Sequence, residues 1–263
     1  MTRFSANLGF LWTELSLPKA IHAAAEAGFH AVECHWPYDT PVEEVRAALK
    51  QTNLPMLALN TRRGDVAAGE NGLAAMPGRK DEARNAIDEA IGYANAISAR
   101  NVHVMAGFAE GELARQTFIE NLQYASLQAA EHGIGILVEP LNTYDAPGYF
   151  LRSTEQAREL ILETGLTNLR LMFDCYHVQL MEGDLSHKLE KHFEIIGHIQ
   201  FASVPDRGPP DAGEVNFPHI FKVLDDLGYQ QPLGAEYKPR TSTNGSLGWL
   251  KTTIGDPFAL LGT

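Results

Sequence analysis

Short apolar stretches alternate with longer amphipathic ones along the whole chain. The short stretches are four to six residues long and rich in Val, Ile, Leu and Ala, as buried strands are. The longer ones carry apolar residues three or four positions apart, as helices with one buried face do. The pattern predicts eight strands, at residues 4–9, 31–34, 55–60, 102–106, 134–139, 169–174, 197–202 and 233–237.

A helix is expected after each of these strands. Ser16 and Gly28 bracket the first, and Ser153 and Gly165 bracket another, as N-cap and C-terminal glycine signals do. A long polar loop at 61–79 interrupts the pattern once. The other expected helices begin at Thr40-Pro41 or occupy 81–98, 112–132, one or two pieces of 178–196, 218–227 and 246–253.

Eight strand–helix units in 263 residues amount to about 33 residues per unit. Regular alternation of this kind predicts a parallel sheet with helical crossovers. Eight units at this length fit a (β/α)₈ TIM barrel, and we expect one α/β domain spanning 1–263. An open doubly wound sheet is the alternative. It has less support, because no G-x-G-x-x-G follows the first strand and no G-x-x-x-x-G-K-[ST] is present.

Charge, apolar content and cysteine count exclude several classes of protein. There are 21 Lys and Arg against 33 Asp and Glu, a net charge of −12, which disfavours nucleic acid as a partner. No run of about 18 apolar residues is present, so no membrane span is expected. The polar N-terminal segment does not resemble a secretion signal. Only Cys34 and Cys175 are present, so we expect a reducing, cytoplasmic location.

Four polar side chains fall at or near the ends of the last four predicted strands. They are Glu139, Asp174, Gln200 and Glu236. One acid at a strand end is as often a helix cap or a salt-bridge partner as a functional group. In a TIM barrel, however, the carboxyl ends of all strands meet at one mouth, where active sites lie. The barrel therefore predicts that these four side chains converge.

Convergence of three carboxylates requires a compensating charge, because they repel one another and their pKa values rise. A divalent cation supplies it. Three carboxylates and one amide form an all-oxygen ligand set suited to Mg²⁺ or Mn²⁺. Zn²⁺ is expected to recruit His or Cys instead. We therefore expect a metal site made of Glu139, Asp174, Gln200 and Glu236.

Further candidates surround this mouth. His177 is expected to contact substrate, with packing at a helix start as the alternative. Arg207 suits a substrate carboxylate, since guanidinium binds carboxylate with two hydrogen bonds, although a solvated loop charge is the alternative. Lys238 is expected to support the rim. Glu70 is expected to contact substrate from the 62–79 loop, which is long enough to be a lid. His103 is expected to be a hydrogen-bonded core histidine.

The motifs together resemble the hydroxypyruvate isomerase family, within the xylose-isomerase-like barrel superfamily. The likeness runs along nearly the whole chain, and its segments are highly specific in combination. They are RFSANL at the start, PYD at 37–39, GD-x-AAGE-x-G at 64–72, PGR at 77–79, EP-x-N at 139–142, FDCYH at 173–177, GHIQ-A at 197–202, GE-x-N at 213–216 and EYKP at 236–239.

The resemblance implies roles for these residues. Glu139 and Glu236 correspond to the two glutamates that accept and donate the substrate proton, and both also join the metal set. His177 and Arg207 correspond to substrate-binding positions. Related ketose 3-epimerases carry His where this chain has Gln200, which favours the isomerase branch. The family resemblance also implies a homo-oligomer, a dimer or a tetramer.

The implied reaction is the aldose–ketose type isomerisation of hydroxypyruvate and tartronate semialdehyde through an enediolate. A 2-oxo-tetronate isomerase or a ketose 3-epimerase is an alternative on the same site, although the EPLN sequence at 139–142 favours hydroxypyruvate. The stretches 35–38 and 61–63 depart from the family pattern and are expected to line the pocket. A sugar-acid binding protein and a zinc-dependent DNA repair endonuclease are the alternatives from other classes, and the acidity disfavours the second.

Overall fold

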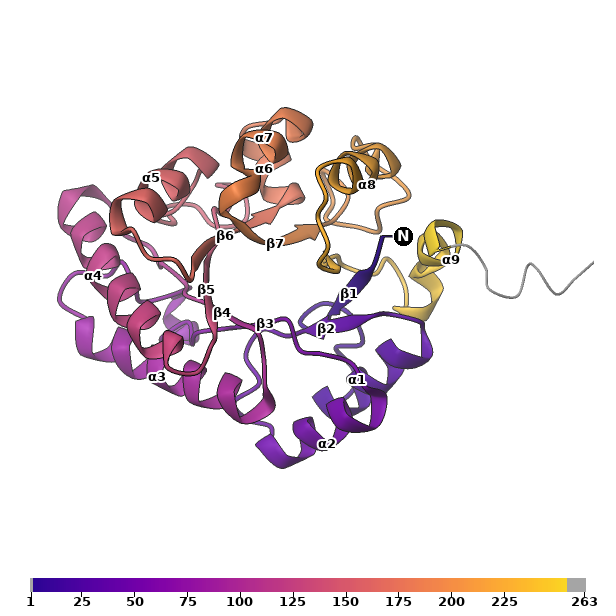
Figure 1. The fold of residues 1–263 in the computed structure, drawn as a ribbon, viewed down its shortest axis with the longest axis horizontal. Helices are drawn as coiled ribbons and strands as arrows, with labels where there is room; N and C mark the ends of the chain where they lie inside the picture. The colour runs from indigo at the N-terminus through magenta and orange to yellow at the C-terminus, as the bar shows by residue number, and fades with distance from the viewer. Residues whose placement is uncertain (1, 255–263) are drawn as a thin grey trace, which may run out of the picture.

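In the computed structural model, which describes residues 2–254, eight parallel strands form a ring surrounded by helices (Figure 1). The predicted TIM barrel is confirmed. The ends of the predicted 1–263 domain, residue 1 and residues 255–263, lie outside the described residues. The strands are β1 (Phe4–Asn7), β2 (Ala31–Glu33), β3 (Ala58–Asn60), β4 (Asn101–His103), β5 (Gly135–Val138), β6 (Leu169–Asp174), β7 (Ile196–Phe201) and β8 (Leu233–Ala235).

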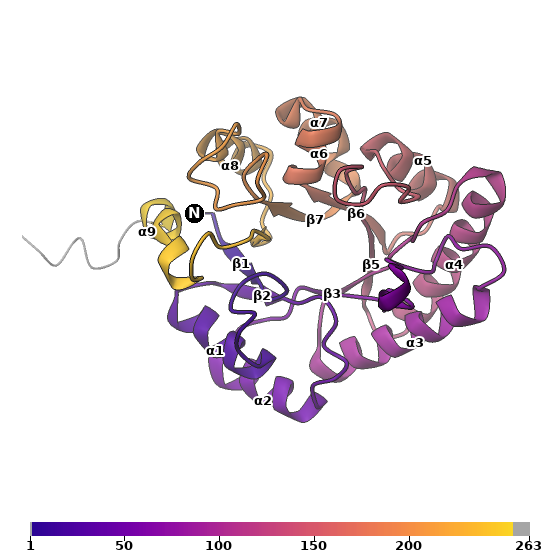
Figure 2. The same ribbon diagram turned by 180° about the vertical axis from the view of Figure 1, so that it is seen from behind.

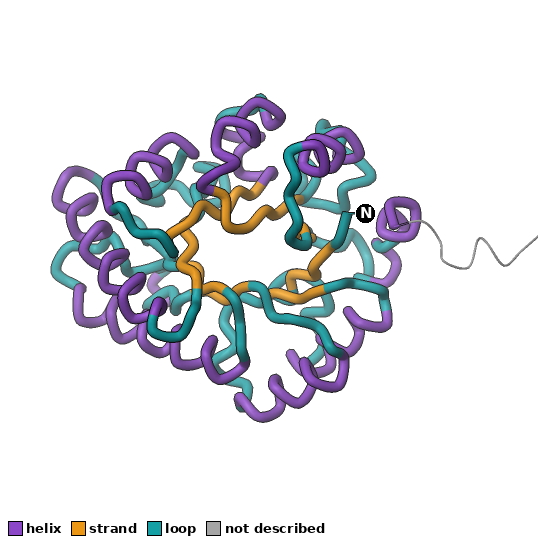
Figure 3. Tube along the Cα trace, in the orientation of Figure 1, coloured by secondary structure: helices purple, strands orange, loops and turns teal. Residues whose placement is uncertain are grey.

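The sheet order is β2-β1-β8-β7-β6-β5-β4-β3, so β2 and β3 are the two strands whose pairing closes the ring. They meet through a parallel bridge between Val32 and Met56. Leu57 N–H donates to the Val32 carbonyl at 2.8 Å, and Cys34 N–H donates to the Ala58 carbonyl at 3.1 Å. The strand tube in Figure 3 shows the resulting ring.

Helices cover the outside of the ring in both views (Figures 1 and 2). Three short 3₁₀ turns, at 66–68, 193–195 and 244–246, lie between them. The helices are α1 (Leu17–Glu26), α2 (Val42–Thr52), α3 (Lys80–Ile97), α4 (Gly111–Ala130), α5 (Thr154–Thr164), α6 (Cys175–Met181), α7 (Leu185–His192), α8 (Phe217–Asp226) and α9 (Gly248–Ile254). In residues 2–254, no helix combines the length and apolar character needed to cross a membrane.

The region after β6 differs from the prediction at its start. A helix was expected from residue 178, but α6 begins at Cys175, directly after the strand. The Asp174 carboxylate accepts a hydrogen bond from Tyr176 N–H at 2.8 Å and so caps this helix. The strand and the helix are therefore continuous, and Asp174 is held rigidly at their junction.

Strand residues alternate between the helical layer and the barrel interior. In β1, Phe4 packs against Phe221 of α8 and Trp249 of α9, with ring centroids 5.2 and 5.1 Å apart. Ser5 and Asn7 face inward, where their side chains bond to carboxylates of other strands. The interior therefore becomes polar toward the mouth, over an apolar cluster of Ala58, Leu137 and Met172.

Candidate active site

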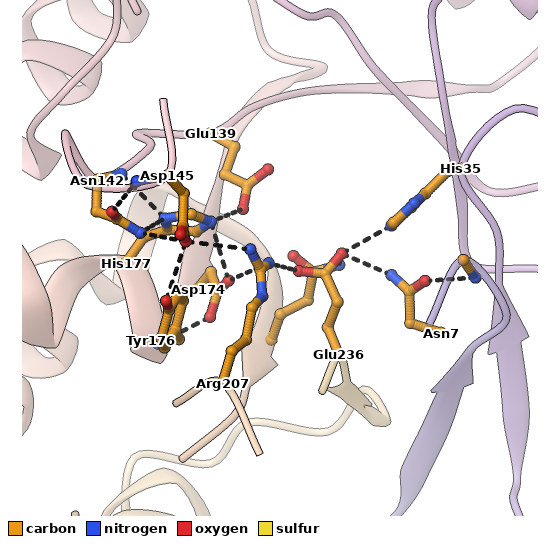
Figure 4. Close-up of polar contacts among 12 residues, drawn as sticks. Asn7, His35, Glu139, Asn142, Asp145, Asp174, Tyr176, His177, Arg207 and Glu236 are labelled. Atoms are coloured by element: carbon orange, nitrogen blue, oxygen red, sulfur yellow. Dashed lines mark hydrogen bonds and ion pairs between the residues drawn. The ribbon is translucent and has the colours of Figure 1, made fainter. Parts of the chain in front are cut away.

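The four predicted strand-end residues meet at the carboxyl end of the barrel. Asp174 ends β6 and Gln200 lies in β7, while Glu139 and Glu236 directly follow β5 and β8. All four are at most 6% exposed. Figure 4 shows Asp174 and Glu139 on one side of this mouth and Glu236 on the other.

Arg207 lies between the carboxylates (Figure 4). Its Nη2 contacts Glu236 Oε2 and lies 3.3 Å from Asp174 Oδ2, while Nη1 lies 3.8 Å from Asp145 Oδ2. The guanidinium stacks on Tyr176, 4.8 Å from the ring centroid. Burial opposes the charge of Arg207, but the surrounding carboxylates outweigh burial and hold its pKa above the ordinary value. Arg207 is therefore a mostly buried counter-charge at the mouth, with a side chain 11% exposed, rather than a solvated loop residue.

Glu236 is held by a donor from β1 and by a residue that follows β2. Asn7 Nδ2 donates to its Oε1 at 2.8 Å, and His35 Nε2 lies 3.0 Å from the same oxygen. Burial tends to raise the pKa of Glu236. The charge of Arg207 and the contact with His35 outweigh burial and lower this pKa to about 2.

Glu139 has the opposite environment. Burial raises its pKa well above the ordinary value, and the negative charges of Glu236 and Asp174 raise it further. Burial also raises the pKa of Asp174, to about 7, although Arg207 opposes the change. The two glutamates thus have pKa values pushed apart, as acid and base partners in one site do.

His177 is fixed in one tautomer by its surroundings. Its Nδ1 accepts a hydrogen bond from Asn142 N–H at 2.9 Å, so Nδ1 carries no proton. Burial lowers the pKa of His177 to about 3, which keeps the ring neutral and places the proton on Nε2. Nε2 lies 3.6 Å from Asp174 Oδ2 and 3.8 Å from Glu139 Oε1. His177 is thus a hydrogen-bond donor into the mouth, not a free nitrogen ligand.

The other residues predicted from the sequence, Glu70, Lys238 and His103, make contacts other than those expected. Glu70 pairs with Arg79, and its Oε2 accepts from Asp65 N–H at 2.6 Å, so its side chain stabilises its own loop. The Lys238 side chain is exposed, and its backbone N–H donates to the Arg207 carbonyl at 2.7 Å. His103 is buried, but neither ring nitrogen has a hydrogen-bond partner, contrary to our expectation.

Asp145 of the mouth was not singled out from the sequence. Asn7 and Asn142 entered only as members of quoted family segments, and His35 only as part of the stretch 35–38 that was expected to line the pocket. Asn7 and His35 bond to Glu236, while Asn142 fixes His177 and Asp145 faces Arg207. Asn7 ends β1 and His35 follows β2 by two residues, so the barrel rule could have found both. Asn142 and Asp145 lie in the loop after β5, and no periodic pattern marks them.

The mouth suits a hard divalent cation. One oxygen each of Glu139 and Asp174 lies within 4.8 Å of the other and of a His177 nitrogen. Glu139 Oε1 and Gln200 Oε1 are buried with no hydrogen-bond partner. Unpaired buried acceptors are costly. A cation would satisfy both, and carboxylate and amide oxygens are the donors that Mg²⁺ and Mn²⁺ prefer.

The raised pKa of Asp174 predicts an effect on stability. Well below its ordinary pKa of 3.8, the Asp174 carboxyl is protonated in both the folded and the unfolded state. Between 3.8 and about 7, only the folded state keeps the proton. The free energy of unfolding therefore falls as pH rises through this range. Asp174→Asn removes the loss and retains an N-cap residue. We expect its metal-free stability, relative to wild type, to rise by about 1–3 kcal/mol from pH 4.5 to 7.5.

Urea unfolding in EDTA at the two pH values measures this difference. The exposed Asp211→Asn variant is the control and should show no such trend. A stability difference between Asp174→Asn and wild type that does not change with pH would refute the raised pKa.

Comparison with known proteins assigns the chain to a family. The family model described as "Xylose isomerase-like TIM barrel" matches residues 21–253. A 2-oxo-tetronate isomerase from Cupriavidus necator is 45% identical over 259 residues, which cover 97% of this chain and 100% of the relative. The hydroxypyruvate isomerase of Escherichia coli is 39% identical over 263 residues, which cover 98% of this chain and 100% of the relative.

Solved structures show the same fold. One titled as an AP endonuclease, family 2, from Brucella melitensis is 43% identical with a TM-score of 0.92, covering 96% of this chain and 99% of that one. A D-psicose 3-epimerase from Clostridium cellulolyticum has a TM-score of 0.77 at 15% identity, covering 99% and 94% of the two chains. At that identity the likeness concerns the fold alone.

The barrel, its acidic mouth and these matches define a TIM-barrel isomerase. The chain belongs to the xylose isomerase-like TIM barrel family. Its relatives of nearly the same length include a hydroxypyruvate isomerase and a 2-oxo-tetronate isomerase.

Proposed function

We propose that the protein is a divalent-cation-dependent isomerase of a short 2-oxo acid, interconverting hydroxypyruvate and tartronate semialdehyde. The observation that carries this proposal is the pair Glu139 and Glu236, two buried carboxylates of one mouth whose pKa values are displaced in opposite directions. Moving a proton between adjacent carbons needs one group that accepts and one that delivers it. A binding protein has no such need.

Glu139, Asp174, Gln200 and Glu236 would hold the cation. Bound there, Mg²⁺ or Mn²⁺ would polarise the substrate carbonyl and offset the negative charge of an enediolate. One glutamate takes the carbon-bound proton next to the hydroxyl group. The other delivers a proton to the former carbonyl carbon, while the hydroxyl proton passes to the former carbonyl oxygen.

Two further residues suit an acidic substrate. The buried Nε–H of Arg207 has no acceptor among residues 2–254, although its two Nη atoms are engaged. A substrate carboxylate would supply that acceptor with a charge-assisted bond. The Nε2–H of His177 points into the mouth and can donate to a substrate oxygen. This arrangement supports a 2-oxo acid over an uncharged ketose.

A 2-oxo-tetronate is the second candidate substrate, because the Cupriavidus necator relative with that name matches nearly full length. The ketose 3-epimerase alternative has weaker support, since the epimerase likeness is one of fold alone. A zinc-dependent endonuclease is disfavoured by the all-oxygen ligand set and by the net charge of −12.

Turnover of a substrate panel tests the proposal. Hydroxypyruvate, 2-oxo-tetronates and free ketoses are each assayed with Mg²⁺ or Mn²⁺. We expect kcat/KM for one of the 2-oxo acids to exceed that for every ketose by about 100-fold or more. A ketose would leave the Nε–H of Arg207 without an acceptor, which costs about 1–3 kcal/mol. Equal or higher kcat/KM for a ketose would contradict the proposed substrate class.

A further inference from the structure

A further buried carboxylate lies within the barrel, below those of the mouth. Glu33, the last residue of β2, is 1% exposed and does not contact the other carboxylates through any hydrogen bond. It is bonded by three side chains. Ser5 Oγ donates to Oε1 at 2.9 Å, while His198 Nε2 and Gln200 Nε2 lie 3.0 and 2.8 Å from Oε2.

The neighbouring strand is shaped to admit this carboxylate. Gly234 of β8 pairs in register with Gln200 and with Ser5. A Cβ at Gly234 would lie 2.3 Å from Glu33 Oε1 and 2.8 Å from Gln200 Cγ, closer than real Cβ contacts. Gly234 thus provides the space in which Glu33 reaches the Gln200 amide.

The contact determines which end of the Gln200 amide faces the mouth. A carboxylate only accepts hydrogen bonds, whereas an amide has one donating and one accepting end. Glu33 therefore holds the NH₂ end, which also lies 3.4 Å from Glu236 Oε1, and the amide oxygen points the other way. That oxygen, Gln200 Oε1, is buried without a hydrogen-bond partner. If the amide were reversed, its NH₂ would face the cation site and could not ligate.

We propose that Glu33 is a positioning residue of the cation site: its carboxylate orients the Gln200 amide so that Oε1 is presented to the metal. The inference rests on the proposed cation. Hydrogen-bond partners of metal ligands commonly orient those ligands toward the ion, and Glu33 would have this role for Gln200. The alternative is that Glu33 only links β1, β2 and β7 within the core.

Mn²⁺ affinity, measured by titration with EPR detection, separates the two roles without an activity assay. Glu33→Leu removes the acceptor, and we expect Mn²⁺ to bind about 10- to 100-fold more weakly. Glu33→Gln can present its oxygen to Gln200 and its NH₂ to Ser5, so we expect rescue to within about threefold of wild type. Ser5→Ala, which leaves both contacts to Oε2, should also stay within about threefold.

A double-mutant cycle with Gln200→Ala identifies the path of the effect. In that background, Glu33→Leu should change Mn²⁺ affinity by less than about twofold, because no amide remains to be oriented. The proposal would be overturned if Glu33→Leu weakened Mn²⁺ binding equally with and without Gln200. It would also be overturned if Glu33→Leu left Mn²⁺ affinity unchanged. Wild-type protein that binds no Mn²⁺ would overturn the proposed function, and the role of Glu33 with it.

A crystal structure of wild-type protein with Mn²⁺ keeps the test decisive if Glu33→Leu fails to fold. We expect the Gln200 amide to coordinate the ion, which identifies the coordinating atom as oxygen, with the other end on Glu33. An ion without contact to Gln200, or a Gln200 side chain turned away from Glu33, would contradict the proposal.

Discussion

Replacing Glu139 or Glu236 by Gln is expected to lower kcat by about 10³-fold, the typical worth of a positioned acid or base. Gln is similar in size but cannot carry the proton. Each variant should remain folded. Glu139→Gln should be more stable than wild type near neutral pH without metal. The raised pKa of Glu139 makes wild-type stability fall as pH rises above the ordinary pKa of the carboxyl, and Gln has no proton to lose. Steady-state kinetics and thermal unfolding measure the two effects.

The matched control is Glu131→Gln, an exposed residue at the end of α4, which should retain wild-type kinetics. Activity within tenfold of wild type in either Glu139→Gln or Glu236→Gln would show that the pair does not transfer the proton. Loss of folded protein in both variants would instead assign them a structural role.

Removing divalent cations is expected to lower kcat by about 100-fold or more, since Lewis-acid stabilisation of this kind contributes several kcal/mol. The protein should remain folded, because Arg207 already lies between Asp174 and Glu236 and partly neutralises them. Activity should return with Mg²⁺ or Mn²⁺ and not with Na⁺.

The assay uses protein treated with EDTA and then freed of the chelator, with metal content measured in the same sample. Full activity at less than about one-hundredth of an equivalent of metal would refute the requirement for a cation.

The barrel and the main site residues were predictable for one physical reason. Apolar strand patterns locate the ends of strands, and the closed ring brings these ends together. Asp174, Glu139 and Glu236 needed no further information, because each ends or directly follows a buried run. The ordering of helices and strands was predictable on the same ground, apart from the early start of α6.

The orientation of side chains within the mouth was not predictable in this way. Arg207 has a φ of 54° in a long loop, and no periodicity indicates that its guanidinium returns to the carboxylates. In the sequence, nothing distinguishes Glu33 from other acidic residues at the ends of short strands. Its contact with Gln200 joins residues 167 positions apart, which no local pattern indicates. Glu70 was expected to contact substrate from a lid, but nothing in the sequence indicated that Arg79 would bind it first.

Proton transfer by the two glutamates is tested most directly by ¹H NMR of the conversion of hydroxypyruvate in D₂O with Mg²⁺ present, since Mg²⁺ is diamagnetic and does not broaden the signals. Because one carboxylate accepts the carbon-bound proton and a second, solvent-equilibrated carboxylate delivers another, the account predicts deuterium at the newly formed C–H bond of tartronate semialdehyde. Product that fully retains the substrate's own hydrogen at the new C–H bond would contradict proton transfer by the two carboxylates. That result would indicate a hydride shift.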